Sequence, residues 1–166
     1  MNDPQPERHL TSQAEPQLRD LFSFVAGGRT FAVPAEEVEG TADSKHVAAL
    51  PQAPPAVVGV LCVRGRMLTT LDPVALLTGE RLSWPPMIPC VVALRGDEQL
   101  ALAAESFGGT ITVAENDIEA PAGEDGRSHR SLIGISRHGG AEIWILTVTD
   151  LFAAAFQRRE RRRRRF

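Results

Sequence analysis

Two segments in the first half of this sequence recur, in the same order, in the second half. Residues 24–41 and residues 92–110 both contain a strand pattern, a turn with glycine, a second strand, an Ala-Glu pair and a closing threonine. Residues 57–77 and residues 132–154 both contain an apolar strand with an early glycine, a second turn and strand, and an aspartate before a helix. The repetition predicts an internally duplicated β unit closed by a short helix. Because units of about 65 residues are marginally stable alone, the two copies are expected to share an interface.

The composition agrees with a β-rich chain that turns often. The 166 residues are 43% hydrophobic but only 5% aromatic, and tyrosine is absent, so aliphatic side chains must fill the core. Twelve prolines and fourteen glycines indicate short elements joined by tight connections. We predict a mainly all-β fold with short helices. One subdomain is expected over about residues 21–83 and a second over about 89–156, with the linker WPPMIP between them.

The first hairpin is predicted from the alternation of apolar residues that begins at Leu21. Its turn is expected at Gly27-Gly28, a two-residue hairpin signal. The return strand covers residues 30–33, where Pro34 indicates a sheet edge or a bulge because proline cannot donate a backbone hydrogen bond.

The second hairpin follows a proline-rich connector. Residues 57–63 are apolar at consecutive positions, which predicts a strand buried on both faces. Arg64-Gly65-Arg66 is then a turn, and residues 67–71 return as the next strand.

A short helix is predicted directly after that strand. Asp72 is a good N-cap, Pro73 suits the first helical turn, and Gly79 suits the C-terminal cap. In the second copy, Asp150 occupies the place of Asp72.

No pattern for catalysis, a cofactor or a metal ion is found. The single lysine, Lys45, has no glycine-rich loop before it, and no histidine lies three to five residues from another histidine or a cysteine. Cys62 and Cys90 both lie in apolar runs, which indicates buried structural thiols. The sequence therefore predicts a protein that is not an enzyme. The lack of a spanning apolar run or a signal-peptide pattern predicts a cytoplasmic protein.

The two ends of the chain differ in charge from the body. Residues 1–20 are polar and are expected to form a mobile arm. Residues 157–166 form an arginine-rich tail, whose last nine residues carry a charge of +6, so the whole-chain charge of −3 leaves −9 on residues 1–157. The tail arginines are Arg158, Arg159, Arg161, Arg162, Arg163, Arg164 and Arg165.

Several roles are open for this tail. It can be a solvated end that aids solubility, or it can bind the phosphates of nucleic acid or an anionic membrane surface. It can also fold back on the acidic body in a contact that salt would release.

Two interpretations are open for the turn at Arg64-Gly65. The simpler is that Gly65 supplies a positive φ and the arginine is merely solvated. The alternative is that Arg64 is held at the edge of the fold to anchor a partner, since arginine is favoured in interface centres.

The segment LPQAPPAVVGVLCVRGRMLTTLDPVALLTG resembles the signature of CheW-like domains, in which a proline loop leads into a G-V-x-x-x-R-G turn, a strand and a short helix. FSFVAGGRTFAVPAEEVEG is similar to the opening hairpin of that family, and SLIGISRHGGAEIWILTVTDLF is similar to its closing strands. The resemblance covers about residues 20–156. It implies two SH3-like five-stranded β-barrels side by side.

The resemblance also implies a function. CheW-like proteins are adaptors that couple methyl-accepting chemoreceptors, through the receptor's cytoplasmic tip, to the regulatory domain of a CheA-type histidine kinase. Carried onto this sequence, the contact region comprises Val33, Val38, Gly59, Arg64 and Gly65.

The sequence departs from the family at this contact region. The Glu and Ile that follow Val38 in the family pattern are here Gly40 and Thr41. Arg66 opens a strand that in the family begins with an apolar or acidic residue. The acidic-then-apolar strand of the second barrel is reduced to AESFGG. These changes suggest a dedicated or divergent pathway, or a lost partner.

Two function hypotheses follow. The first is a cytoplasmic adaptor, recruited to receptor arrays, in a two-component chemosensory pathway. The second is a scaffold that uses the barrels for oligomerisation and is tethered to nucleic acid or anionic membrane through the arginine tail.

Overall fold

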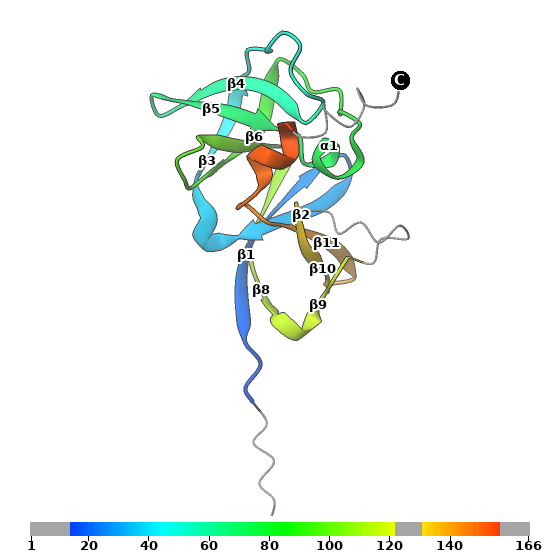
Figure 1. Cartoon of the computed structure of the whole chain (residues 1–166). Coiled ribbons are helices and arrows are strands. Elements are labelled where there is room, and N and C mark those ends of the chain that lie inside the picture. The colour runs from blue at the N-terminus through cyan, green and yellow to red at the C-terminus, as the bar shows by residue number, and fades with distance from the viewer. Residues whose placement is uncertain (1–13, 122–130, 157–166) are drawn as a thin grey trace, which may run out of the picture.

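A computed structural model describes residues 14–121 and 131–156, and the predicted arginine tail lies outside them. The described chain is mostly β and forms two curled sheets, which confirms the predicted fold class (Figure 1). The six-stranded sheet has the order β8 (Ser106–Ala114), β1 (Leu18–Ala26), β2 (Arg29–Pro34), β11 (Ala141–Leu146), β10 (Leu132–His138), β9 (Ile118–Glu119). The five-stranded sheet has the order β3 (Val38–His46), β6 (Met87–Leu94), β7 (Leu100–Ala104), β5 (Arg66–Leu71), β4 (Val57–Val63).

Each sheet combines strands from both halves of the sequence. The hairpin β1–β2 joins the sheet that holds β8 to β11, and the matching hairpin β6–β7 joins the sheet that holds β3, β4 and β5. Parallel pairing of β2 with β11 and of β5 with β7 makes these junctions. The boundary expected at residues 83–89 therefore does not separate the two sheets. The repeats exchange their first hairpins, so neither half can complete its sheet without the other.

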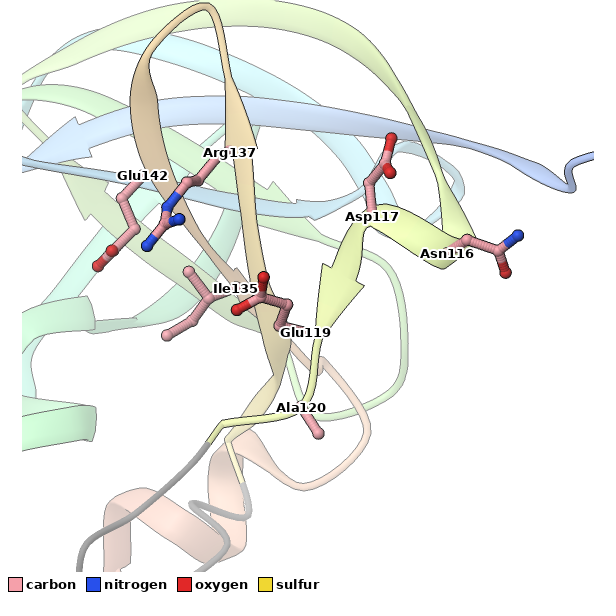
Figure 2. Close-up of a pocket in the computed structure, with 7 residues that line it drawn as sticks. All are labelled: Asn116, Asp117, Glu119, Ala120, Ile135, Arg137 and Glu142. Atoms are coloured by element: carbon pink, nitrogen blue, oxygen red, sulfur yellow. The ribbon is translucent and has the colours of Figure 1, made fainter.

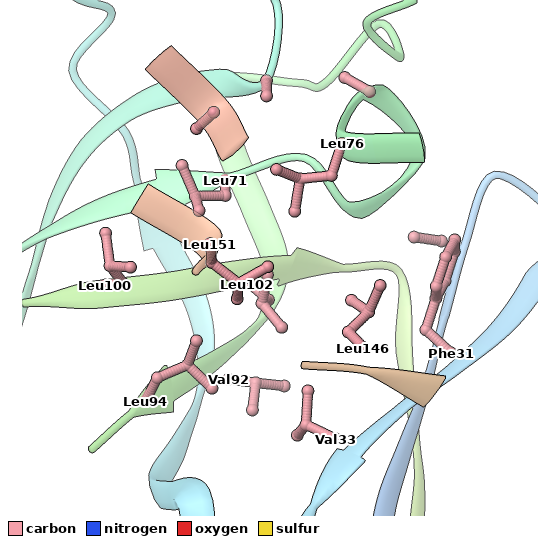
Figure 3. Packing of buried hydrophobic residues seen from close by; sticks show 14 of the residues in the cluster. Phe31, Val33, Leu71, Leu76, Val92, Leu94, Leu100, Leu102, Leu146 and Leu151 are labelled. Carbon is pink, nitrogen blue, oxygen red and sulfur yellow. The ribbon is translucent and has the colours of Figure 1, made fainter. Parts of the chain in front are cut away.

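The shared core explains why exchange is stable. The largest buried cluster takes side chains from both sheets and from the helix α1 (Pro73–Thr78), as Figure 3 shows for Phe31, Leu71, Leu102 and Leu146. Two smaller clusters lie each within one sheet. Leu151, from the helical residues 151–156, also enters the shared cluster. Burial of aliphatic surface between the sheets is thus the main force that joins the two repeats.

The first strand begins earlier than the sequence indicates. Residues 18–20 were expected in the mobile arm, but they belong to β1 and pair with β8, with Leu18 opposite Ala114. The side chain of Leu18 is 68% exposed, so no apolar pattern marks this extension. Backbone pairing with a neighbouring strand, rather than burial of side chains, orders these residues. Residues 1–13 of the predicted arm lie outside the described chain.

Two-residue turns close three hairpins, at Gly27-Gly28, Arg64-Gly65 and Gly139-Gly140. In each turn both residues have positive φ, as the favoured hairpin turns with two left-handed residues require. Arg64, at φ 50°, is the one non-glycine residue among these six positions.

A matched glycine occupies the same structural place in both repeats. Gly59 in β4 and Gly134 in β10 each lie at a register shift in their hairpin. A Cβ on Gly59 would lie 2.3 Å from the carbonyl oxygen of Ala48, and a Cβ on Gly134 would lie 2.6 Å from that of Glu119. In both repeats a preceding segment pairs closely with the outer edge of the hairpin, and only glycine leaves room for it. The agreement supports the duplication seen in the sequence.

The helix α1 forms as predicted. Asp72 is fully buried, and its carboxylate accepts hydrogen bonds from the backbone N–H of Val74 at 2.9 Å and of Ala75 at 3.2 Å. Its second oxygen accepts one from Leu82 N–H at 2.7 Å. Gly79 ends the helix in a left-handed conformation at φ 81°. Asp72 therefore both caps the helix and fixes the segment that leads to the linker.

The expectation of two buried thiols is wrong for Cys62, which is exposed. Its strand, β4, is the edge of the five-stranded sheet, and side chains there alternate between the buried Leu61 and Val63 and the outward Cys62. A run of apolar residues suggested burial on both faces, whereas only one face of the sheet is covered near this hairpin tip, so every second side chain there points outward. Cys90 is partly buried.

Candidate docking surface

The hairpin tip between β4 and β5 lies beside the start of β3 and forms the surface that the sequence singled out. We define the Arg64 surface as Glu39, Gly40, Arg64, Gly65 and Arg66. Strand β3 supplies the first two residues, and the hairpin turn and the first residue of β5 supply the others. Arg64 and Gly65 are both exposed and therefore accessible to a partner.

Arg64 has an unfavourable backbone conformation and a side chain with no polar partner among the described residues. Its left-handed conformation costs an L-residue roughly 1–2 kcal/mol relative to the right-handed region. The guanidinium lies against Gly40, with Nη1 3.4 Å from the position that a Cβ of Gly40 would take. Among the described residues, no hydrogen bond or ion pair satisfies this guanidinium. The arginine is thus positioned by the turn and by packing, and its N–H donors stay open.

Arg66 and Glu39 form an ion pair across β5 and β3. Both side chains are more than a third exposed, so the pair stabilises the fold by no more than about 1 kcal/mol. The ion pair matters more for the local charge than for stability. Glu39 lines the same small hollow as Arg64, and Arg66 neutralises its carboxylate. Two of the departures from the family pattern, Gly40 and Arg66, therefore act on the surroundings of Arg64.

A shallow apolar hollow lies next to the guanidinium. Its floor is formed by Val63, Leu68 and Ala93, which belong to the core of the five-stranded sheet. Charged groups from the Arg64 surface form its rim. A rigid arginine beside buried aliphatic side chains is the arrangement found at the centre of protein interfaces, where water is excluded around a few anchors.

The other predicted contact residues have different places. Val33 is fully buried in the shared core, so it supports the sheet junction and cannot touch a partner directly. Val38 is half-buried at the start of β3, where it packs against that core. Gly59 is buried beneath the segment at residues 47–48 and has a structural role. Sequence reasoning grouped these residues by a shared motif, which does not distinguish support from contact.

The neighbouring face of the same hairpin is apolar and was missed. Cys62 and Met67 lie opposite each other in the β4–β5 register, both are exposed, and Val60 on the same face is partly buried. The sequence carried no clear signal for this face, because residues 57–63 are apolar at consecutive positions and do not distinguish an outward side from an inward one.

The matching face of the second repeat is charged. A groove of about 510 Å³ lies between β9 and the β10–β11 hairpin. Its lining residues are drawn in Figure 2. Arg137 and Glu142, which correspond to Cys62 and Met67, line this groove together with Ile135, Asp117 and Glu119. The groove is open to solvent, and no group of three metal-ligating side chains is found in the described ranges.

The one thiol with a shifted pKa among the described residues is not activated. Burial, followed by the nearby Asp43 carboxylate, raises the pKa of the Cys90 thiol, which keeps it protonated and unreactive near neutral pH. In the part of the chain that the structure describes, no helix is long and apolar enough to cross a bilayer.

Comparison with known proteins agrees with the geometry. The family model of the CheW-like domain matches residues 20–156. The chain is 28% identical over 155 residues to Protein FrzA of Myxococcus xanthus, covering 92% of this chain and 96% of that protein. Its fold is similar to that of the scaffolding protein TtCheW from Thermoanaerobacter tengcongensis, with a TM-score of 0.68 at 16% identity over 90% of this chain and 94% of that one. The chain therefore belongs to the CheW-like family of chemosensory adaptors.

Proposed function

We propose that this protein couples chemoreceptors of the methyl-accepting type to a CheA-type histidine kinase. The family consists of non-catalytic scaffolds in chemosensory signalling, and the chain carries its fold over nearly all of the matched region. The observation that carries the proposal is Arg64, an exposed arginine held in a strained turn at the motif position that the family uses for contact. A strained residue that the surrounding fold maintains is a reasonable marker of function.

An adaptor needs two surfaces that work at the same time. The Arg64 surface offers charge beside a small apolar hollow, which suits a specific protein contact. The outer face of β4–β5, with Cys62 and Met67, offers exposed apolar area close by. Two chemically different surfaces on one hairpin support binding to two different partners.

The departures from the family pattern support a dedicated partner rather than a lost one. The family has a glutamate at the position of Gly40, and the glycine has no carboxylate to offer to Arg64. The ion pair at this surface is instead formed by Arg66 and Glu39. Charge is rearranged at this surface while an arginine is kept in a strained backbone. We infer that the protein serves receptors and a kinase that have changed with it.

The coupling proposal includes recruitment to receptor arrays in the cytoplasm. The arginine tail supports a second candidate function. Seven arginines in nine residues give a dense positive charge at the end of an otherwise acidic chain. Such a charge run binds polyanions without sequence preference and in a salt-dependent way. The second candidate is therefore a scaffold that the tail tethers to nucleic acid or to an anionic membrane.

Pairwise binding and bridging distinguish these functions. The purified protein is mixed with the kinase regulatory domain and with a receptor tip fragment from the same organism, with and without residues 158–166. Coupling predicts that the protein binds both fragments, recovers the kinase domain on immobilised receptor fragment, and does so without the tail. Binding only to DNA or to anionic vesicles, lost on removal of the tail, would support the tethered scaffold. Binding to neither fragment would contradict coupling.

A further inference from the structure

The side chain of Arg64 binds no carboxylate in the part of the chain that the structure describes. Glu39 is the carboxylate that lines the same hollow, and Arg66 holds it in an ion pair. Gly40, against which the guanidinium lies, has no side chain to offer. Among the described residues, therefore, a planar group with five N–H donors lies at the surface with none of them bonded.

Its surroundings favour an anionic ligand over water. The guanidinium geometry matches a carboxylate, which can accept two parallel hydrogen bonds from it. Val63, Leu68 and Ala93 form the apolar floor of the adjacent hollow. Docking of a protein there would exclude water and strengthen a charged hydrogen bond.

The backbone of Arg64 is in a left-handed conformation that is unfavourable for an arginine, yet this residue is present in the turn. The corresponding turn of the second repeat is Gly139-Gly140, which adopts the same positive φ values without strain. A glycine at position 64 would serve the hairpin better, so the arginine is there for something other than the fold. Gly40 has no positive φ, so its backbone permits a side chain, and ordinary contact distances would result. The backbone of β3 therefore does not require a glycine at position 40, next to the Arg64 guanidinium.

We propose that Arg64 binds an aspartate or glutamate carboxylate of the protein partner, and that Gly40 keeps this site vacant until the partner supplies it. This inference rests on the proposed coupling function and names the chemistry of one of its two contacts. The kinase regulatory domain is the partner to which we assign the carboxylate, because the site is a single charged anchor beside a small apolar hollow. A receptor tip is a helical bundle, and the apolar face of Cys62 and Met67 suits it better.

The test places a competing carboxylate inside the protein. Gly40→Glu would let a side-chain carboxylate reach the Arg64 guanidinium, whereas Gly40→Gln adds the same bulk without the charge. We expect Gly40→Glu to weaken binding of the kinase regulatory domain about 10-fold or more, and Gly40→Gln to change it less than about 3-fold. Arg64→Gln should weaken binding about 10- to 100-fold, and Arg64→Lys should have an intermediate effect, because it keeps the charge but loses the fork of donors. Thermal unfolding of each variant confirms that it is folded.

A charge reversal identifies the carboxylate itself. Arg64→Glu should abolish detectable binding, and replacement of the contacting acidic residue in the kinase domain by arginine should restore it. Equal weakening by Gly40→Glu and Gly40→Gln would overturn the inference, because bulk rather than charge would be responsible. Unchanged binding in Arg64→Gln would overturn it while leaving coupling intact. A wild-type protein that binds neither kinase domain nor receptor fragment would overturn both.

Discussion

The hairpins β4–β5 and β10–β11 share a bulge at a matched glycine, a two-residue turn and a helix that follows. Their outer faces differ completely. Cys62 and Met67 make the first face apolar, whereas Arg137 and Glu142 make the second charged. The turns differ as well, since the first keeps a strained arginine where the second has two glycines. The two repeats thus share one hairpin scaffold, and the outer face and the turn are where these hairpins differ most in charge and backbone strain.

The largest effect is expected where the two repeats agree. Gly59→Ala would place a Cβ 2.3 Å from a carbonyl oxygen, so we expect it to lower the free energy of unfolding by roughly 2–3 kcal/mol. Gly134→Ala should cost a similar amount, since its Cβ meets Ile118 and Glu119. Gly40→Ala is the control, because it meets only the end of a flexible side chain. Denaturant titration measures all three. A Gly59 variant as stable as the control would contradict the close packing.

The two helix starts should differ in their sensitivity to substitution. Asp72→Ala removes a buried carboxylate that accepts three backbone hydrogen bonds, and we expect a loss of about 2 kcal/mol. Asp150, its counterpart, is exposed and its side chain accepts no hydrogen bond from the described residues, so Asp150→Ala should cost less than about 0.5 kcal/mol. Thermal unfolding of both variants gives the comparison. Equal losses would mean that the second repeat depends on its cap as strongly as the first.

The two turns should respond in opposite directions. Arg64→Gly relieves a left-handed arginine and is expected to raise the free energy of unfolding by about 0.5–1 kcal/mol. Gly139→Arg introduces the same strain and should lower it by about 1 kcal/mol. If Arg64→Gly also weakens binding of the kinase domain, stability has been exchanged for function at this position. An Arg64→Gly protein that is less stable than wild type would show that the arginine is needed for folding.

The smallest expected effect is a difference in chemical reactivity between the two thiols, Cys62 and Cys90. Cys62 is exposed on the edge strand, while Cys90 is partly buried and has a raised pKa caused first by burial and then by Asp43. A raised pKa reduces the fraction of reactive thiolate at any given pH below it, so iodoacetamide should modify Cys62 first at pH 7.5. Peptide mass analysis after brief treatment measures the order. Faster modification of Cys90 would contradict the outward placement of Cys62.

The sequence predicted local structure better than it predicted how the halves join. The turns at Gly27-Gly28 and Arg64-Gly65, the cap at Asp72 and the strand at 57–63 depend on nearby residues, and each is found where the pattern indicated. A hairpin turn was also predicted at the pair Gly108-Gly109, and this was wrong, because both residues lie inside β8. Exchange of the first hairpins depends on which strand edges meet across the core, and no local pattern encodes that. Residues 18–20 were assigned to the arm because no apolar pattern marks them. Their order comes from backbone pairing with β8 and from polar contacts of Arg19 with Glu115 and of Asp20 with Thr112, which are distant in the sequence.

The candidate site shows the same limit. Arg64 and Gly65 were found from the motif, and both lie exposed at the hairpin tip. Val33 was grouped with them, although it is buried, because a motif contains residues that support a surface as well as residues that form it. The ion pair of Arg66 with Glu39 joins two strands 27 residues apart, so it could be recognised only once they were paired. Two departures from the family, Gly40 and Arg66, looked isolated in the sequence, and in the fold they contact Arg64 and Glu39 respectively.

A bridging assay tests the central claim, that the first hairpin and not the second carries the coupling contact. Receptor tip fragment is immobilised, and recovery of the kinase regulatory domain is measured with wild-type protein, Arg64→Gln and Arg137→Gln. The two variants remove one arginine each from corresponding hairpins. We expect wild-type protein to recover the kinase domain, Arg137→Gln to match it within about 2-fold, and Arg64→Gln to reduce recovery by about 10-fold or more. Loss of bridging in Arg137→Gln equal to that in Arg64→Gln, or no bridging by the wild-type protein, would contradict the account.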